Sequence, residues 1–505
     1  MRTHRILPLA AMALFLSIAP RALAQAPGPN AVPPPATPPP QDADAAREEA
    51  LTAELVAVKP GGITADAVGK RAAATSFQAA ASAQALRGAA ARVDAAWGGF
   101  LPRLSGVFRY TRLSDLTPPN LISTGGYSLV ATPAPAGSIN PTPTVAFPLN
   151  FTFPIVVDNW LLQGTLAIPL SDYVFRLNQN YSAATKGERA ARFDLAAARA
   201  KSAADGKIAY YNWIRARWSM VVAQLALGDQ KTHLTDTKNL FQVGNTSQVD
   251  VLRSETGVAA AELAVEQTKH FVELAEMQIR LAIHGGPEEV LLVGEALDGD
   301  LPPIAGDMQT LIGEGQLSRF EVRSIDATAE ALHLQATVVR AGQFPRLDAV
   351  GNVTYANPNQ RIVPTSPTWF PTWDVSLQLS WSPNDVLSSR ANGADVESKA
   401  GQIEAQRQAL RDGIALEVTQ AYQAVLEADF SVVSTQKQLA TAREAVRVAR
   451  ELFKAGRVTS TTLTDAETEL TRARLQTVNA RVDARVARVR LDHALGRDTK
   501  DVKVE

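Results

Sequence analysis

Leu240-Phe241-Gln242-Val243-Gly244 and Leu452-Phe453-Lys454-Ala455-Gly456 are two copies of one turn sequence. The second copy follows the first by 212 residues, the difference between positions 452 and 240. A glycine at the end of each copy suits a helix C-terminus, where a residue with positive φ often ends the helix. Thr246-Ser247 and Thr459-Ser460 then offer side-chain oxygens that can cap a following helix. Each copy therefore predicts a turn between two helices.

The flanking residues carry an apolar repeat of seven. Before the first turn it runs through Trp213, Met220, Leu227, Leu234 and Phe241, and the same shift leads to Val425, Val432, Leu439, Val446 and Phe453. After the first turn, Val258, Val265, Val272 and Ile279 recur at the same interval, and a small residue follows each of them three positions later. In the second copy, the positions that correspond to these small residues are Ala473, Ala480, Ala487 and Ala494. A repeat of seven keeps one seam of a helix against its neighbour. We expect two long antiparallel helical hairpins, over 172–284 and 384–495, produced by an internal duplication.

Each predicted hairpin follows a pair of alternating segments. The first pair covers about 100–112 and 159–170, and the second covers about 345–356 and 372–382. Both pairs open with Pro-Arg-Leu, at residues 102–104 and 345–347. Apolar and polar residues alternate within these segments, which is typical of strands with one apolar and one polar face. A helical stretch precedes each pair, so the first repeat spans 45–284 and the second 308–495.

The remaining segments are predicted to be a leader, a linker and a tail. Residues 1–24 have a basic start, an apolar middle and Ala22-Leu23-Ala24, the pattern of a cleaved signal peptide. A disordered or membrane-anchored N-terminus is the alternative. Residues 25–44 are Pro-rich and predict a disordered leader. A linker is expected over 285–307 and a tail over 496–505.

Composition disfavours several classes of function. A net charge of −1 argues against nucleic acid as a partner. The absence of cysteine excludes disulfides, thiolate metal sites and a lipid anchor on an N-terminal cysteine. No run of 18 apolar residues predicts a membrane-spanning helix. The histidines lack metal-ligand spacing, and neither a nucleotide-binding glycine loop nor a nucleophile elbow is present. We expect no enzyme activity, metal or cofactor.

Four strands are too few to form a membrane barrel alone. A barrel must close in lipid, and the smallest have about eight strands. Several chains must then share one barrel, unless the strands form a small soluble sheet packed on the helices. Aromatic residues near the strand ends favour the barrel, because interface girdles lie there; they are Trp160, Trp369, Trp373 and Trp381. In a soluble sheet the same residues would be core aromatics.

Together these features resemble the TolC family of outer-membrane efflux proteins over about residues 60 to 495. The resemblance is carried by the two Pro-Arg-Leu strand entries, the two turns, and the stretches GNTSQVDVLRSE from Gly244 and GRVTSTTLTDAE from Gly456. It implies an α+β membrane protein that assembles as a homotrimer in outer-membrane lipid. The three chains would share a twelve-stranded barrel in the outer membrane and an α-helical tunnel in the periplasm, through which substrate passes unchanged.

The resemblance also implies roles for the turn residues. A periplasmic adaptor, the membrane fusion protein, would dock at the tips, with an inner-membrane pump of RND or ABC type beyond. The docking residues would be Leu240, Phe241, Gly244, Leu452, Phe453 and Gly456. A simpler interpretation is that the two phenylalanines only close the seam of their own hairpins, and both interpretations can hold together.

A periplasmic gate is implied near the same tips. Family members often carry acidic residues six and nine positions past the second turn glycine. Here Asp465 fits the ninth position, while Thr462 departs from the pattern at the sixth. The matching first-repeat positions are Asp250 and Arg253, and Arg457 lies nearby. The alternative is that these are solvated charges at helix ends.

The leading hypothesis is a passive exit duct of a tripartite efflux or secretion system. The alternative is a secreted or periplasmic coiled-coil scaffold or adhesin with a small β-cap. An outer-membrane enzyme is a third idea, disfavoured by the missing site residues. The apolar outer face of the four strands separates the first two hypotheses.

Overall fold

The computed structural model describes residues 42–115, 156–297, 299, 301–363 and 365–498. The chain divides into two compact units, Met1–Arg47 and Glu48–Glu505. Helix α1 (Asp42–Leu55) begins in the first unit and inside the expected leader. The expected signal peptide, most of the leader and most of the link between the first two strands lie outside the described residues. Everything that follows concerns the second unit.

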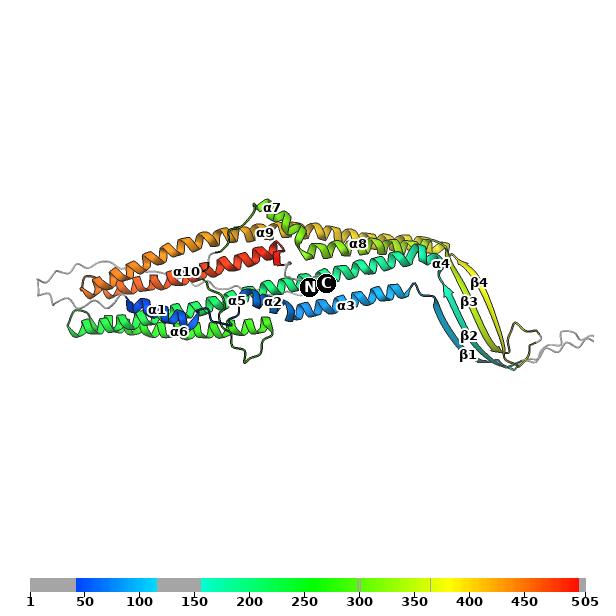
Figure 1. The fold of residues 1–505 in the computed structure, drawn as a ribbon, viewed down its shortest axis with the longest axis horizontal. Coiled ribbons are helices and arrows are strands. Elements are labelled where there is room, and N and C mark those ends of the chain that lie inside the picture. Colours follow the sequence, from blue (N-terminus) through cyan, green and yellow to red (C-terminus); the bar gives the residue numbers. More distant parts are fainter. Residues whose placement is uncertain (1–41, 116–155, 298, 300, 364, 499–505) are drawn as a thin grey trace, which may run out of the picture. The chain divides into compact units, whose positions relative to one another are not determined.

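The helical part contains two long hairpins (Figure 1). The first consists of α5 (Asn178–Gln242) and α6 (Gln248–Ile283), and the second of α9 (Pro383–Lys454) and α10 (Ser460–Ala494). Shorter helices accompany them: α2 (Ala65–Thr75), α3 (Phe77–Gly98), α7 (Met308–Ser318) and α8 (Phe320–Arg340). Three one-turn segments join helices to strands: α4 (Leu170–Asp172), a π-helical turn (Tyr173–Leu177) and a 3-10 turn (Ala341–Gln343).

The two hairpin turns have the same backbone geometry. Gly244 has φ 78° and Gly456 has φ 69°, so each glycine occupies the left-handed region that disfavours other residues. Asn245 N–H donates to the carbonyl of Leu240, as Arg457 N–H does to Leu452, at 2.8 and 2.9 Å. These bonds satisfy carbonyls that the helix end leaves free.

The caps after the turns differ in part from the prediction. Ser247 and Thr459, which are 212 residues apart, each accept a bond from the backbone N–H three residues on. Thr246 and Ser460 do not cap. Thr246 instead donates to Asp250, and the buried hydroxyl of Ser460 lies 3.0 Å from Nε2 of His233.

The helical stretch expected before each pair of strands consists of two helices. Ser76 has φ −57° and ψ 130°, which ends α2, and its hydroxyl caps α3. Arg319 adopts an extended backbone between α7 and α8. Its largely buried guanidinium reaches Glu321 at 2.8 Å and Glu417 at 2.5 Å. A bonded polar side chain lies at each break, and an apolar repeat does not report such residues.

The helices pack as an open layer. In the half that carries the turns, neighbouring helices follow the order α6, α5, α10, α9. In the half near the strands, the order is α3, α5, α8, α9. Both long helices α5 and α9 run through the two halves (Figure 1). The layer therefore has one edge at α9 and another at α6 and α3.

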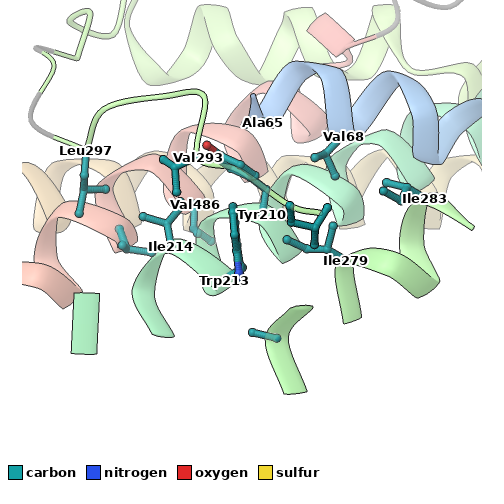
Figure 2. Close-up of a cluster of buried hydrophobic side chains, with 13 residues drawn as sticks. Ala65, Val68, Tyr210, Trp213, Ile214, Ile279, Ile283, Val293, Leu297 and Val486 are labelled. Carbon is teal, nitrogen blue, oxygen red and sulfur yellow. The ribbon is translucent and has the colours of Figure 1, made fainter. Parts of the chain in front are cut away.

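The main core lies where the segment between the repeats crosses the helices. Figure 2 shows Tyr210 and Trp213 of α5 against Val68, Ile279 and Val486 from three other helices. Val293 and Leu297 of the expected linker join this core, and Ile63 pairs with Val293 in a β-bridge. Arg485, 5% exposed, donates to the carbonyls of Ala296 and Gly299 at 3.2 Å. The segment that its glycines and Pro302-Pro303 predict to be a linker is thus bonded to α10.

The strands form one antiparallel sheet in the order β1, β2, β3, β4. Their bounds are β1 (Arg103–Arg112), β2 (Asp158–Ile168), β3 (Arg346–Asn357) and β4 (Phe370–Ser380). The register places Leu162 opposite both Phe108 and Tyr355, and Val353 opposite Trp373. Because side chains alternate between faces, this register puts most of the large apolar residues of the four strands on one face, whereas Val107, Leu161, Val350 and Phe370 lie on the other. None of the described helices has the length and apolar character needed to cross a bilayer.

Candidate functional site

One face of the sheet is apolar and uncovered. Leu104 is 80% exposed, Trp373 74% and Leu377 71%. The same face carries Phe108, Tyr110, Trp160, Leu162, Leu166, Val353, Tyr355, Val375 and Leu379, all of which are exposed. Soluble proteins rarely expose an apolar patch of this extent, which marks a surface that contacts lipid or another protein.

The opposite face is polar and bonded across strands. Asn352 of β3 accepts a bond from Thr165 at 2.8 Å and from Gln163 at 3.3 Å. It donates in turn to Asp374 of β4 at 2.9 Å. Arg361, from the β3–β4 loop, binds the same carboxylate at 2.6 Å. A sheet with one apolar and one hydrated face can separate lipid from water.

Three of the four predicted tryptophans lie toward the two ends of the apolar face. Trp160 contacts Tyr110, and Trp369 stacks on Tyr355, with ring centroids 4.3 and 4.9 Å apart. Both pairs lie at the end of the sheet farther from the helices. Trp381, at the other end, donates its indole N–H to the carbonyl of Gln343 at 3.2 Å. Trp373 lies three residues inside β4 instead of at its end.

Both edges of the sheet and of the helical layer are open. Within the described residues, β1 and β4 each pair with a strand on one side only. The edge helices expose large apolar side chains where no other described helix packs. On α6 these are Leu263, Phe271, Leu274, Met277 and Leu281, and on α9 they are Leu387, Leu416, Leu426, Phe430 and Val433. These edges can therefore bind further polypeptide.

The two predicted docking turns are not equivalent. Phe241 is 45% exposed at the first tip, whereas Phe453 is 3% exposed at the second. Phe453 packs with Ala449, Leu463 and the partly buried Leu240. The Phe453 ring therefore belongs to the core between the hairpins and is not available at the surface, while Gly244 and Gly456 are exposed.

An apolar recess of about 760 Å³ lies between α9 and α10 beside the second turn. Val448, Leu452 and Val458 line it, together with Ala440, Thr441, Glu444, Ala445, Ala449 and Thr462. Of the docking residues predicted in the second turn, Leu452 is therefore the one that lines this recess.

The predicted gate residues have different surroundings in the single chain. Asp250 accepts bonds from Ser247 and Thr246, and the Ser247 bond is the main cause that lowers the pKa of this carboxyl. Arg253 lies 3.9 Å from Asp250. Asp465 is exposed on α10 and has no bond to a described residue, and Arg457 is exposed beside the turn. Thr462 lies 3.0 Å from Thr459 at the start of α10. Asp250 therefore acts as a helix cap in the isolated chain.

Sequence reasoning missed a buried ionic cluster that joins the hairpins. Glu467 of α10 is 3% exposed and accepts a bond from Gln230 of α5 at 3.0 Å. Arg450 of α9 lies 3.7 Å from Glu467 and 3.4 Å from Asp229. Arg474 binds Asp229 at 3.2 Å. The sequence does contain a signal for this cluster, because the charged Glu467 lies on the same helical seam as two leucines, at 463 and 470.

Burial raises the pKa of Glu467 to about 8, and the nearby Asp229 carboxylate adds to the increase, while Arg450 opposes it. A group buried in this way prefers its neutral form. Among the described residues, no group of three or more histidines and carboxylates is placed to hold a metal ion.

Comparisons with known proteins agree with this architecture. The family model described as outer membrane efflux protein matches residues 68–284 and 311–497. The outer-membrane channel OprN is 20% identical, with 86% of this chain and 89% of OprN covered and a TM-score of 0.68. The CmeC outer membrane channel of Campylobacter jejuni is 14% identical, with coverage of 93% and 94% and a TM-score of 0.65.

The outer membrane protein VceC of Vibrio cholerae is 15% identical, with coverage of 86% and 96% and a TM-score of 0.65. At these identities the likeness is one of fold. Among curated protein sequences, none matches the chain.

The raised pKa of Glu467 predicts a dependence of stability on pH. The folded value of about 8 exceeds the ordinary 4.5, so the folded chain keeps a proton that the unfolded chain releases. This contribution to stability is complete below about pH 4.5 and is lost as pH rises through about 8. The uncharged Glu467→Gln variant is expected to avoid the loss. Its melting temperature should exceed that of the wild type by a margin that grows from about pH 5 to about pH 8.5.

Glu469→Gln serves as the control, because Glu469 is exposed on the same helix. We expect it to shift the melting temperature by an amount that does not change with pH. A margin for Glu467→Gln that stays constant over the same pH range would contradict the assignment.

Proposed function

This chain belongs to the outer membrane efflux protein family, and on that premise we propose that three copies form the exit duct of a tripartite efflux or secretion system. The duct would conduct solutes from the periplasm to the exterior without changing them chemically. The observation that carries the proposal is the sheet, with its uncovered apolar face, its hydrated face and two open edges.

The strand number supports closure by repetition. Because the four strands alternate in direction, β4 of one copy and β1 of the next would meet antiparallel. In lipid every backbone donor and acceptor must be paired, so the open edges have to be joined. Three copies would supply twelve strands, above the minimum of about eight for a membrane barrel. The apolar face would then contact lipid and the polar face would line the channel.

The helical layers of the three copies would close into a ring in the same way as the strands. The open edge at α9 would meet the α6 and α3 edge of the next copy, and the exposed apolar side chains of both edges would be buried there. A ring of this kind uses one head-to-tail interface repeated by rotation. The long hairpins would form a periplasmic tunnel whose tips are the two turns, with the gate residues close to the threefold axis.

The alternative is a soluble coiled-coil scaffold or adhesin. Such a protein would need its sheet covered by its own helices, whereas Leu104 and Trp373 are both more than 70% exposed. Cell fractionation distinguishes the two functions. A duct is recovered in the outer membrane, and a scaffold is recovered as a soluble protein.

We propose that the periplasmic adaptor, with an inner-membrane pump beyond it, docks an apolar side chain in the recess beside the second turn. Val448→Asp places a charge in this recess and is expected to abolish adaptor capture by the purified trimer, because a buried unpaired charge is costly. Val290→Asp, at an exposed position between the repeats, is the control and should bind normally. Normal capture by Val448→Asp would rule out this recess.

Cysteine cross-linking tests the shared barrel, because the chain has no cysteine of its own. Ser105 of β1 and Ser376 of β4 lie on the polar face, three strand spacings apart, or about 14 Å at the usual spacing. A disulfide requires Cα atoms within about 7 Å, so S105C can join S376C or Q378C only in another copy. Oxidation should yield covalent dimers and trimers and nothing larger.

Single-cysteine variants control for random collision and should not form trimers. If both double variants remain monomeric under oxidation, the strands are not shared as proposed.

A further inference from the structure

The polar face of the sheet contains a recess that faces the proposed channel. The recess has a volume of about 380 Å³ and lies at the end of the sheet farther from the helices. Arg109 and Thr111 of β1 line one side, and Asn359 and Arg361 of the β3–β4 loop line the other. Its further lining residues are Leu113, Asn159, Trp160, Leu161, Thr354, Ala356, Pro358, Gln360 and Thr372.

The β3–β4 loop is held rigidly over this recess. Asn359 is 3% exposed, and its side-chain amide donates to the carbonyl of Phe370 at 3.0 Å and to Thr372 at 3.1 Å. Its side-chain oxygen accepts the backbone N–H of Arg361 at 3.0 Å. Arg361 also donates to the carbonyl of Trp373 at 3.2 Å. The guanidinium is therefore fixed beside the recess before any ligand arrives.

The charge on this face is unbalanced. The described strands and the β3–β4 loop contribute four arginines, at 103, 109, 346 and 361, against two aspartates, at 348 and 374. Each aspartate is bound by an arginine, Asp348 by Arg346 at 3.0 Å and Asp374 by Arg361 at 2.6 Å. Arg103 and Arg109 form no ion pair with a described residue. The face therefore has an excess of two positive charges per chain.

We propose that this recess binds the anionic groups of exported solutes, such as carboxylates, phosphates or sulfonates, with Arg109 as the main contact. The proposal rests on the duct proposed above. The planar guanidinium donates two parallel bonds to oxyanions of these classes. A cleft lined by one sign of charge raises the local concentration of the opposite ion. Threefold repetition would place three such recesses around the mouth of the channel.

Electrical recordings of the full-length trimer in planar lipid bilayers test the site. The permeability ratio of chloride to potassium is measured from the reversal potential in a KCl gradient. Arg109→Gln should lower the ratio by about two-fold or more, because it removes three positive charges from the trimer mouth. Inorganic pyrophosphate should reduce the wild-type current and have a weaker effect on Arg109→Gln.

Two further variants serve as controls. Arg109→Lys keeps the charge and should retain most of the wild-type ratio. Arg87→Gln removes an exposed arginine from α3 and should leave the ratio and the pyrophosphate effect unchanged. A current through Arg109→Gln with the wild-type ratio and pyrophosphate effect would overturn the site alone. Intact wild-type trimers that carry no current would overturn the duct, and the site with it.

Discussion

Backbone hydrogen bonding is the constraint on which the structure depends. The outer edges of β1 and β4 carry amide and carbonyl groups that no described strand of this chain pairs. In water such an edge invites aggregation, and in lipid each unpaired group costs several kcal/mol. The edges of the helical layer are also uncovered, since α6 and α9 expose leucine and phenylalanine side chains there. Repetition of the chain around one axis satisfies both requirements with a single interface.

The two turns are alike in backbone and different in environment. Both use a glycine with positive φ, yet Phe241 reaches solvent and Phe453 is buried against Leu463. The difference arises because α10 packs on α5, while α6 lies at the edge of the layer. The second hairpin is thereby tied to the first, because Glu467 accepts a bond from Gln230 and Arg450 binds Asp229.

The hairpins and strands could be predicted because their patterns are periodic. The seven-residue repeat and the paired turn glycines indicate where α5 and α9 end and where α6 and α10 begin, and the alternation in β4 gives its apolar face directly. The breaks at Ser76 and Arg319 could not be predicted, because a polar cap and a buried ion pair interrupt no apolar repeat. Arg109 and Arg361 are far apart in sequence, so only the strand register and the loop reveal that they line one recess.

The gate remains a prediction from the family pattern. Asp465 is exposed in the single chain, as a residue would be if its partners came from neighbouring copies, while Asp250 is already used as a cap. The mass of the detergent-solubilised protein, measured by native mass spectrometry, tests the central claim most directly. We expect a single species of three chains. A single species of one chain would contradict it, because the open edges would then have no partner.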